Sequence, residues 1–143
     1  MGDVVEIGNG LVSGHDRAFR WPTGRPLPPG EEAAFLPVLK AKALGSIQVG
    51  QAIPYIYLNP FDADEATLKA RFPVVMAHLK PFRQRLERRY SYDRDLPYWE
   101  WAFLRNLKLF QGDTTKLFVP CKDRLSKRDR LRFGVVGTGV YGS

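Results

Sequence analysis

The sequence contains a single cysteine, Cys121, and two histidines. One cysteine excludes an internal disulfide and a zinc site built from several cysteines. His15 and His78 are far apart and share no ligand spacing with Cys121, so metal and hydrolase chemistry lack their usual residues. No apolar run approaches the about 18–20 residues of a membrane helix, and no charged-then-apolar leader is present. We therefore expect a soluble, cytoplasmic protein with no membrane partner, no metal and no catalytic residue.

The length and composition favour one folded domain. A chain of 143 residues with 44% hydrophobic residues is long enough and apolar enough to bury a core. Helical and strand patterns alternate along it without the regular order of β-α-β units. The prediction is an α+β fold, a small mixed sheet with packed helices, over residues 1–143.

The first half of the sequence suggests short elements. Val4–Ile7, Ala18–Trp21 and Ile53–Leu58 resemble strands, with Pro54 at a strand start or a sheet edge. Residues 22–30 hold four prolines and two glycines and predict an exposed loop. Residues 33–44 suit a short helix interrupted near Pro37.

The clearest helical pattern follows. Asp62 and Glu65 have the spacing of a capping box, which opens a short helix that must stop before Pro73. Pro81 falls inside the next helix and should kink or divide it. The apolar stripe of that helix has alternating steps of four and three residues, through Val75, Leu79, Phe82 and Leu86.

The excess of positive over negative charge lies entirely in the second half of the sequence. Residues 1–72 hold 7 Lys and Arg against 8 Asp and Glu, so residues 73–143 hold 22 − 7 = 15 against 15 − 8 = 7, a net charge of +8. This asymmetry favours a polyanionic partner, although a solvated face or an acidic protein neighbour would also explain it. The candidate DNA-binding residues form two groups, on the helix (Arg85, Arg88, Arg89) and in a basic stretch (Lys122, Arg124, Lys127, Arg128, Arg130, Arg132).

Aromatic residues gather between these two groups. Tyr98, Trp99, Trp101 and Phe103 are too clustered to be all exposed, so we interpret them mainly as core, with base stacking by one of them as the weaker option. Residues 116–119 predict a buried strand that ends at Pro120, and residues 131–136 another strand. His15 with Asp16 is interpreted as a turn cap, and His78 as a packing or surface residue.

One match to catalytic chemistry is rejected. Asn59-Pro60-Phe61-Asp62 is similar to the Asn-Pro-Pro-aromatic loop with which amino-methyltransferases hold a flipped adenine, but its second proline is absent. The sequence also lacks a Gly-rich strand-to-helix turn for a nucleoside cofactor. We interpret the segment as an ordinary turn.

Three stretches resemble a known family, the C-terminal specificity domain of TaqI-like adenine DNA methyltransferases, found also in type IIG restriction–modification enzymes and BREX phage-defence methyltransferases. They are residues 10–19, with the entry motif Gly-x-x-Ser-Gly-His; residues 79–89, with a Leu, aromatic, basic, Leu and Arg pattern; and residues 97–120, with a Pro-Tyr-Trp-Glu series. Ser13, His15, Tyr98 and Pro81 depart from the family pattern. The residues that match it are Gly10, Gly14, Phe82, Arg83, Leu86, Trp99, Glu100, Arg105, Lys116 and Pro120.

The resemblance implies a division of labour. A separate catalytic domain would bind S-adenosylmethionine and methylate adenine at N6, whereas this chain, C-terminally incomplete and without a cofactor of its own, would read the site on double-stranded DNA. Glu100 and Arg105 are equally suited to structural pairing and to DNA contact. The resemblance also implies a bacterial or archaeal source.

The function predicted from the sequence is therefore sequence-specific DNA recognition for an adenine methyltransferase or restriction–modification enzyme. Two alternatives stay open: a basic interaction module that docks a catalytic partner, and a small RNA-binding domain. An independent enzyme ranks last.

Overall fold

The structure, a computed structural model, describes residues 8–40, 52–90, 93–111, 115–119, 134–136 and 141–142. The chain forms two compact units, each made of segments that are not consecutive in sequence. One unit comprises residues 12–36 and 54–103, and the other comprises residues 1–11, 37–53 and 104–143. The expectation that residues 1–143 form one incomplete domain stays a prediction.

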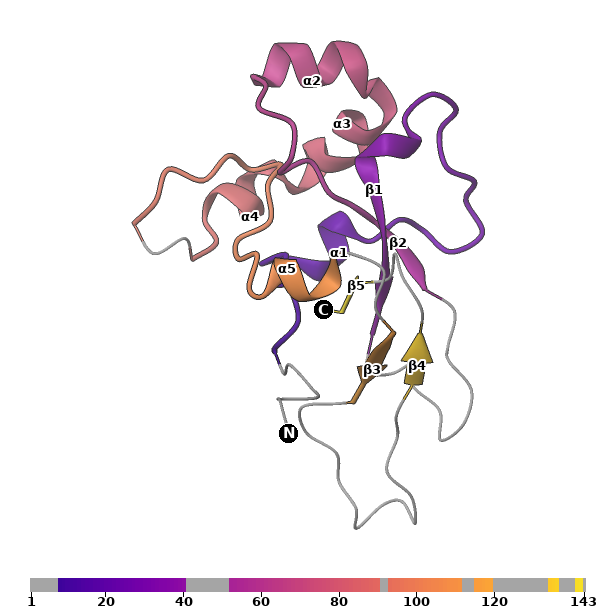
Figure 1. The fold of residues 1–143 in the computed structure, drawn as a ribbon. Coiled ribbons are helices and arrows are strands. Elements are labelled where there is room, and N and C mark those ends of the chain that lie inside the picture. The colour runs from indigo at the N-terminus through magenta and orange to yellow at the C-terminus, as the bar shows by residue number, and fades with distance from the viewer. Residues whose placement is uncertain are drawn as a thin grey trace, which may run out of the picture. The chain divides into compact units, whose positions relative to one another are not determined.

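Short helices and short strands are mixed along the chain, and the α+β prediction is confirmed (Figure 1). One sheet has the strand order β2-β1-β5, and a second pairs β3 with β4. The helices are α1 (Asp16–Phe19), α2 (Glu65–Arg71), α3 (Pro73–Leu79), α4 (Arg83–Glu87) and α5 (Leu107–Phe110), with 3-10 turns η1 (Glu32–Ala34) and η3 (Lys80–Phe82). The strands are β1 (Phe35–Leu39), β2 (Ile53–Ile56), β3 (Lys116–Phe118), β4 (Gly134–Val136) and β5 (Tyr141–Gly142).

Helix α2 begins at Glu65, two residues later than a cap at Asp62 predicts. The cap is Asp64, whose carboxylate accepts a hydrogen bond from the Thr67 amide at 2.8 Å. The predicted capping box starting at Asp62 is therefore wrong by two residues, because Asp64 lies three residues before the amide that it caps. The helix ends at Arg71, ahead of Pro73, as predicted.

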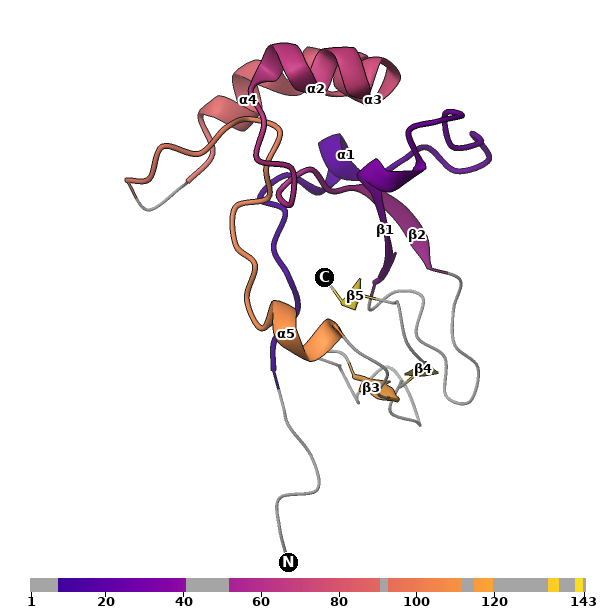
Figure 2. The same ribbon diagram turned by 45° about the horizontal axis from the view of Figure 1, so that its top comes forward.

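Pro81 divides the next helix into two. It lies in the 3-10 turn η3, between α3 and α4, because proline has no amide hydrogen to continue the α-helical ladder. The stripe residues Val75, Leu79 and Leu86 are buried, and Phe82 is half-buried. α2, α3 and α4 follow one another in both views, and α1 packs against α3 (Figure 2).

The start of α3 is held by a residue distant in sequence. The residue before its first turn, Phe72, offers no side-chain cap. The buried carboxylate of Glu31 instead accepts hydrogen bonds from the amides of Val74 and Val75, each at 2.9 Å. An anion at this end satisfies amides that have no partner within the helix.

Two predictions in the first half are wrong. Residues 18–21 do not form a strand: residues 16–19 form α1, because the His15 imidazole accepts the Ala18 amide at 3.2 Å and closes a helical turn. Arg20 then makes an isolated bridge with Tyr55. The helix expected over residues 33–44 is η1 followed by strand β1 in residues 32–39, and residues 41–44 lie outside the described residues. Tertiary strand pairing overrides local helical propensity there.

Strand β2 is confirmed, with Pro54 near its start, and residues 22–30 form the predicted, mostly exposed loop. β1 and β2 both run from one unit into the other.

In the unit that contains residues 104–143, β3 and β4 are antiparallel, and β1 pairs with β5 in parallel. Phe110 of α5 lies 6.1 Å from Phe118 of β3, measured between ring centroids. Residues 116–118 confirm the predicted strand, but its burial was wrong, since Leu117 is 64% and Val119 63% exposed. β4 confirms part of the strand predicted over residues 131–136; the remainder, and residues 4–7, lie outside the described residues.

Candidate nucleic-acid interface

Helix α4 presents two of the predicted DNA-binding arginines to solvent. Arg85 and Arg88 are exposed, and neither has an ion-pair or hydrogen-bond partner for its side chain in the part of the chain that the structure describes. Arg83 is different, because it bonds Glu87 at 2.7 Å and Glu65 at 3.1 Å. Unlike Arg83, Arg85 and Arg88 thus carry a charge that no described carboxylate balances.

Arg89 lies on the inner side of the same segment. Its half-buried guanidinium donates hydrogen bonds to the carbonyl oxygens of Ser13 and Pro97, each at 3.0 Å, and to that of Glu100. Burial lowers the pKa of Arg89 to about 10, an effect that the charge of Glu100 partly opposes. Arg89 therefore has a structural role in place of the predicted DNA contact: its two terminal nitrogens, Nη1 and Nη2, donate to backbone carbonyls of the chain rather than to phosphates.

The three stretches that resemble the specificity domains meet at this guanidinium. Ser13 belongs to the first stretch, Arg89 to the second, and Pro97 and Glu100 to the third. The Arg89 guanidinium carbon also lies 5.5 Å from the ring centroid of Phe19. The shared sequence pattern thus corresponds to one packed structure around a single arginine.

Backbone contacts next to Arg89 also join the first and third of these stretches; we call this meeting point the junction. Val12 and Phe103 form an antiparallel bridge, and the Ala102 amide donates to the Ser13 carbonyl at 3.3 Å. Gly14 has φ +83°, and a Cβ there would lie 3.0 Å from the Ala102 Cβ and 3.1 Å from Arg89 Cδ. Glycine is required at this motif position both by backbone conformation and by the close approach.

The aromatic cluster is mainly core, as predicted. Trp101 is 1% exposed, and its indole N–H donates to the Ile56 carbonyl at 2.7 Å. The rings of Phe19, Tyr55 and Tyr57 surround it at centroid distances of 6.3, 6.1 and 5.4 Å. The stacking role for one of these aromatic residues stays a prediction.

Tyr98 joins the cluster to the helices. Its hydroxyl donates to Glu65 at 3.1 Å, and the guanidinium of Arg83 lies 4.8 Å above its ring. Burial is the main reason that the pKa of Tyr98 rises to about 12, and the hydrogen bond to Glu65 adds to it. Arg83, a family-motif residue, is thus part of the framework that supports α4.

Glu100 and Arg105 differ in setting. Glu100 is half-buried, and burial raises the pKa of its carboxyl, although Arg89 and Arg94 oppose that rise. The backbone carbonyl of Glu100 accepts a hydrogen bond from Arg89, which agrees with a structural role for Glu100 rather than a DNA contact. Arg105 is exposed, and Lys116 is half-buried in β3. Pro120 and the whole basic group from Lys122 to Arg132 lie outside the described residues, so their DNA contacts stay predictions.

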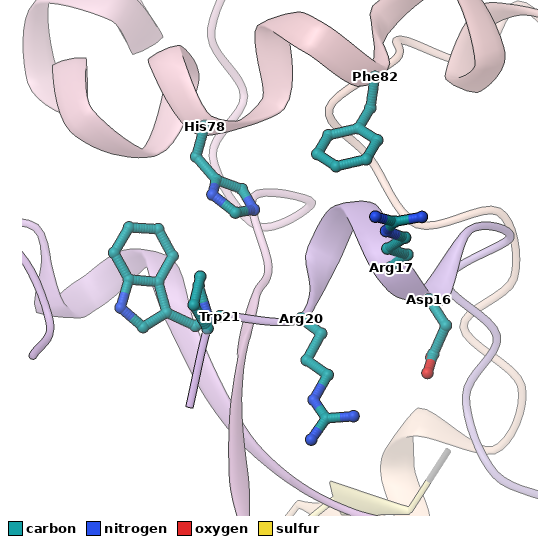
Figure 3. Close-up of a pocket in the computed structure, with 7 residues that line it drawn as sticks. Asp16, Arg17, Arg20, Trp21, His78 and Phe82 are labelled. Atoms are coloured by element: carbon teal, nitrogen blue, oxygen red, sulfur yellow. The ribbon is translucent and has the colours of Figure 1, made fainter. Parts of the chain in front are cut away.

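The sequence did not reveal a groove beside α1. Its volume is about 480 Å³, and the lining residues are Asp16, Arg17, Arg20, Trp21, Pro22, His78 and Phe82 (Figure 3). The only sequence signal for this groove was the pair Arg17 and Arg20, three residues apart. The prediction of a strand from residue 18 gave no reason to place the two residues at one site. In the structure Arg17 lies in α1 and Arg20 is the extended residue that directly follows it, so both arginines line the groove from the same short segment.

Both histidines have the structural roles expected for them. The His15 imidazole caps α1, and the Nε2 of His78 donates to the Ala18 carbonyl at 3.1 Å. Burial lowers the pKa of His78, and the positive charge of Arg25 lowers it further against the opposing effect of the Ala18 carbonyl. Across the described ranges, no cluster of His, Cys, Asp or Glu is suited to a metal ion, and no helix is long and apolar enough to cross a bilayer.

No protein-family model matches the chain, but individual proteins are similar to it. Over 141 residues, 99% of this chain, it is 38% identical to the type II methyltransferase M.HindII of Haemophilus influenzae, of which it spans 27%. Over 80 residues, 56% of this chain, it is 44% identical to M.HincII of the same species, of which it spans 16%.

A more distant relative comes from an archaeon. The chain is 30% identical over 126 residues to the type II methyltransferase M.MjaIV of Methanocaldococcus jannaschii. The matched region covers 85% of this chain and 42% of M.MjaIV. In all three cases the chain spans less than half of the relative. The chain is related to type II DNA methyltransferases and is similar to a part of them.

Proposed function

We propose that this chain reads DNA sequence for a type II methyltransferase or restriction–modification enzyme, as a TaqI-like specificity domain. The observation that carries the proposal is the contrast within one helical segment. Arg89 is bound to three backbone carbonyls of the domain, whereas Arg85 and Arg88, on the same short segment, stay exposed without a carboxylate partner among the described residues. The hydrogen bonds of Arg89 thus fix the segment from which Arg85 and Arg88 extend into solvent.

The chemistry of arginine suits the proposed target. Guanidinium groups bind phosphate oxygens through charge-assisted hydrogen bonds, and they bind guanine in the major groove through two parallel bonds. A helix end fixed by buried contacts holds such groups in one orientation, which is needed for reading bases rather than only attracting them. The basic group from Lys122 to Arg132 supplies the remaining predicted phosphate contacts.

Methyl transfer is assigned to the part of the relatives that this chain does not match. By resemblance, the reaction is methylation of adenine at N6 with S-adenosylmethionine. A cofactor of that kind is held by a Gly-rich turn between a strand and a helix. In the described part of the chain, β2 is the strand that leads to a helix, and residues 57–64 between them contain no glycine. The described residues therefore do not fit that cofactor.

The test is a binding measurement as a function of salt. Duplex oligonucleotides carrying candidate sites are titrated with the chain, with fluorescence anisotropy as the readout. If about six phosphates are neutralised, log K should fall with log salt at a slope near −5. Arg85→Gln with Arg88→Gln should make this slope shallower by about 1.8, because each phosphate contact contributes about 0.9.

Two controls separate this proposal from its alternatives. Lys69→Gln with Arg71→Gln on α2 removes the same charge, but Lys69 is paired with Glu65 at 2.6 Å and Arg71 stacks on Phe61 and Phe72. That pair should change the slope much less. Single-stranded RNA that competes better than duplex DNA would favour the RNA-binding alternative, and absence of salt-dependent duplex binding would contradict the proposal.

A docking role is the second candidate, supported by the exposed apolar side chains of Leu117 and Val119. Leu117 lies in β3, and Val119 directly follows the end of that strand. Under this alternative, Leu117→Ser with Val119→Ser would weaken assembly with the catalytic part of a full-length enzyme and leave DNA affinity unchanged.

A further inference from the structure

The groove beside α1 has a rigid aromatic floor. Trp21 is 1% exposed, its ring centroid lies 5.0 Å from that of His78, and the His78 ring lies 6.0 Å from that of Phe82. His78 is fixed by its hydrogen bond to the Ala18 carbonyl. Figure 3 shows His78 and Phe82 pointing from the helix segment toward α1. The floor is therefore apolar and preformed, with no side chain that must move to open it.

Two cations line the same groove. Arg17 and Arg20 are exposed, and neither has a carboxylate within ion-pair distance in the portion of the chain described. The one acidic lining residue, Asp16, already accepts the Tyr55 hydroxyl at 2.8 Å. The groove thus combines a net positive charge with an apolar floor.

The two arginines are spread rather than gathered. In Figure 3, Arg17 extends from α1 toward Phe82, whereas Arg20 extends away from that ring. A single small anion would be held best by guanidinium groups that converge on one point. Cations spaced along an open groove suit a chain of anions instead, such as successive phosphates of a nucleic-acid strand.

We propose that this groove is a second contact with the DNA backbone, in which Arg17 and Arg20 bind phosphates and the half-buried rings of His78 and Phe82 lie against the sugars, supported from beneath by the buried Trp21. The inference rests on the proposed function and extends it to residues of the first half of the chain, where the net charge is −1 by count. Such contacts position the protein on the duplex without reading its sequence.

The experiment compares charge-removing and charge-keeping variants in the same salt titration. Arg17→Gln with Arg20→Gln should make the slope of log K against log salt shallower by about 1.8. The loss should be equal for duplexes with and without a recognised site. Arg17→Lys with Arg20→Lys keeps both charges and should restore most of the slope, and the α2 pair Lys69→Gln with Arg71→Gln is the matched control for net charge.

The outcomes distinguish the two proposals. If the unchanged chain shows no salt-dependent duplex binding, the proposed function fails. If it binds but the Arg17/Arg20 glutamine pair leaves the slope unchanged, or shifts it no more than the α2 control pair, the groove proposal is wrong and the proposed function stands. Circular dichroism confirms that each variant is folded, and the single variants Arg17→Gln and Arg20→Gln replace the pair should the pair unfold.

Discussion

The side-chain amide of Asn59 binds the backbone of Trp101 at both of its polar groups. The Trp101 amide donates to Asn59 Oδ1 at 2.8 Å, and Asn59 Nδ2 donates to the Trp101 carbonyl at 3.3 Å. The Asn-Pro segment is thus a structural turn that holds the central tryptophan, which agrees with its interpretation as an ordinary turn and gives the asparagine a specific task.

Replacing Asn59 should destabilise the fold. Asn59→Ala removes both hydrogen bonds and should lower the free energy of unfolding by about 1–2 kcal/mol, measured by urea denaturation. Asn59→Asp keeps the acceptor but sets a carboxylate against the Trp101 carbonyl, so we expect it to be at least as destabilising at neutral pH. An Asp variant as stable as the unchanged chain would show that the second hydrogen bond contributes nothing.

Arg89 and Arg88 form a matched pair of neighbours with opposite expectations. Arg89→Ala leaves three carbonyl oxygens without their charged donor and should cost about 3 kcal/mol, whereas Arg88→Ala, at an exposed site, should stay within about 0.5 kcal/mol. DNA affinity should show the reverse order once each variant is confirmed to be folded. Arg89→Lys should recover only part of the stability, because one ammonium lacks the fork that reaches several carbonyls.

Gly14 and Gly30 test the close approach at the junction. Both have positive φ, +83° and +81°, but a Cβ at Gly30 would meet nothing within 4 Å. Gly30→Ala should therefore cost only the conformational strain, about 1–2 kcal/mol. Gly14→Ala should cost more, since its Cβ also crowds Ala102 and Arg89. Thermal unfolding of the two variants measures the difference, and equal melting temperatures would contradict the crowding at Gly14.

The buried imidazole of His78 predicts a dependence of stability on pH. Its pKa in the folded chain lies below the usual 6.5, so the unfolded chain binds more protons between the two values. Its contribution is fully present above about pH 6.5 and is lost as the pH falls through the folded pKa. His78→Gln should flatten the change in urea midpoint over this range, and an unchanged slope would show that His78 is not responsible.

Sequence reasoning succeeded where the cause was local. Pro81 had to interrupt the helix because it has no amide hydrogen, and Val75, Leu79 and Leu86 had to face the core because their spacing follows the helical period. It failed for residues 35–39, where the same apolar residues suit a helix or a strand and pairing with β5 decides. The helical turn of α1 was missed because its cap is a histidine imidazole, an uncommon capping group.

For the candidate site too, some features follow from the sequence and others only from the tertiary structure. The sequence by itself determined that arginines cluster on one helical segment, that the aromatic residues are mainly buried, and that the chain resembles specificity domains of DNA methyltransferases. Only the tertiary structure decided that Arg89 faces inward while Arg85 and Arg88 face solvent, that Glu31 caps α3, and that Arg17 and Arg20 line a groove. The partners of Arg89 and Glu31 are backbone groups from distant segments, and every residue has such groups, so no sequence pattern marks the ones that tertiary packing brings into contact.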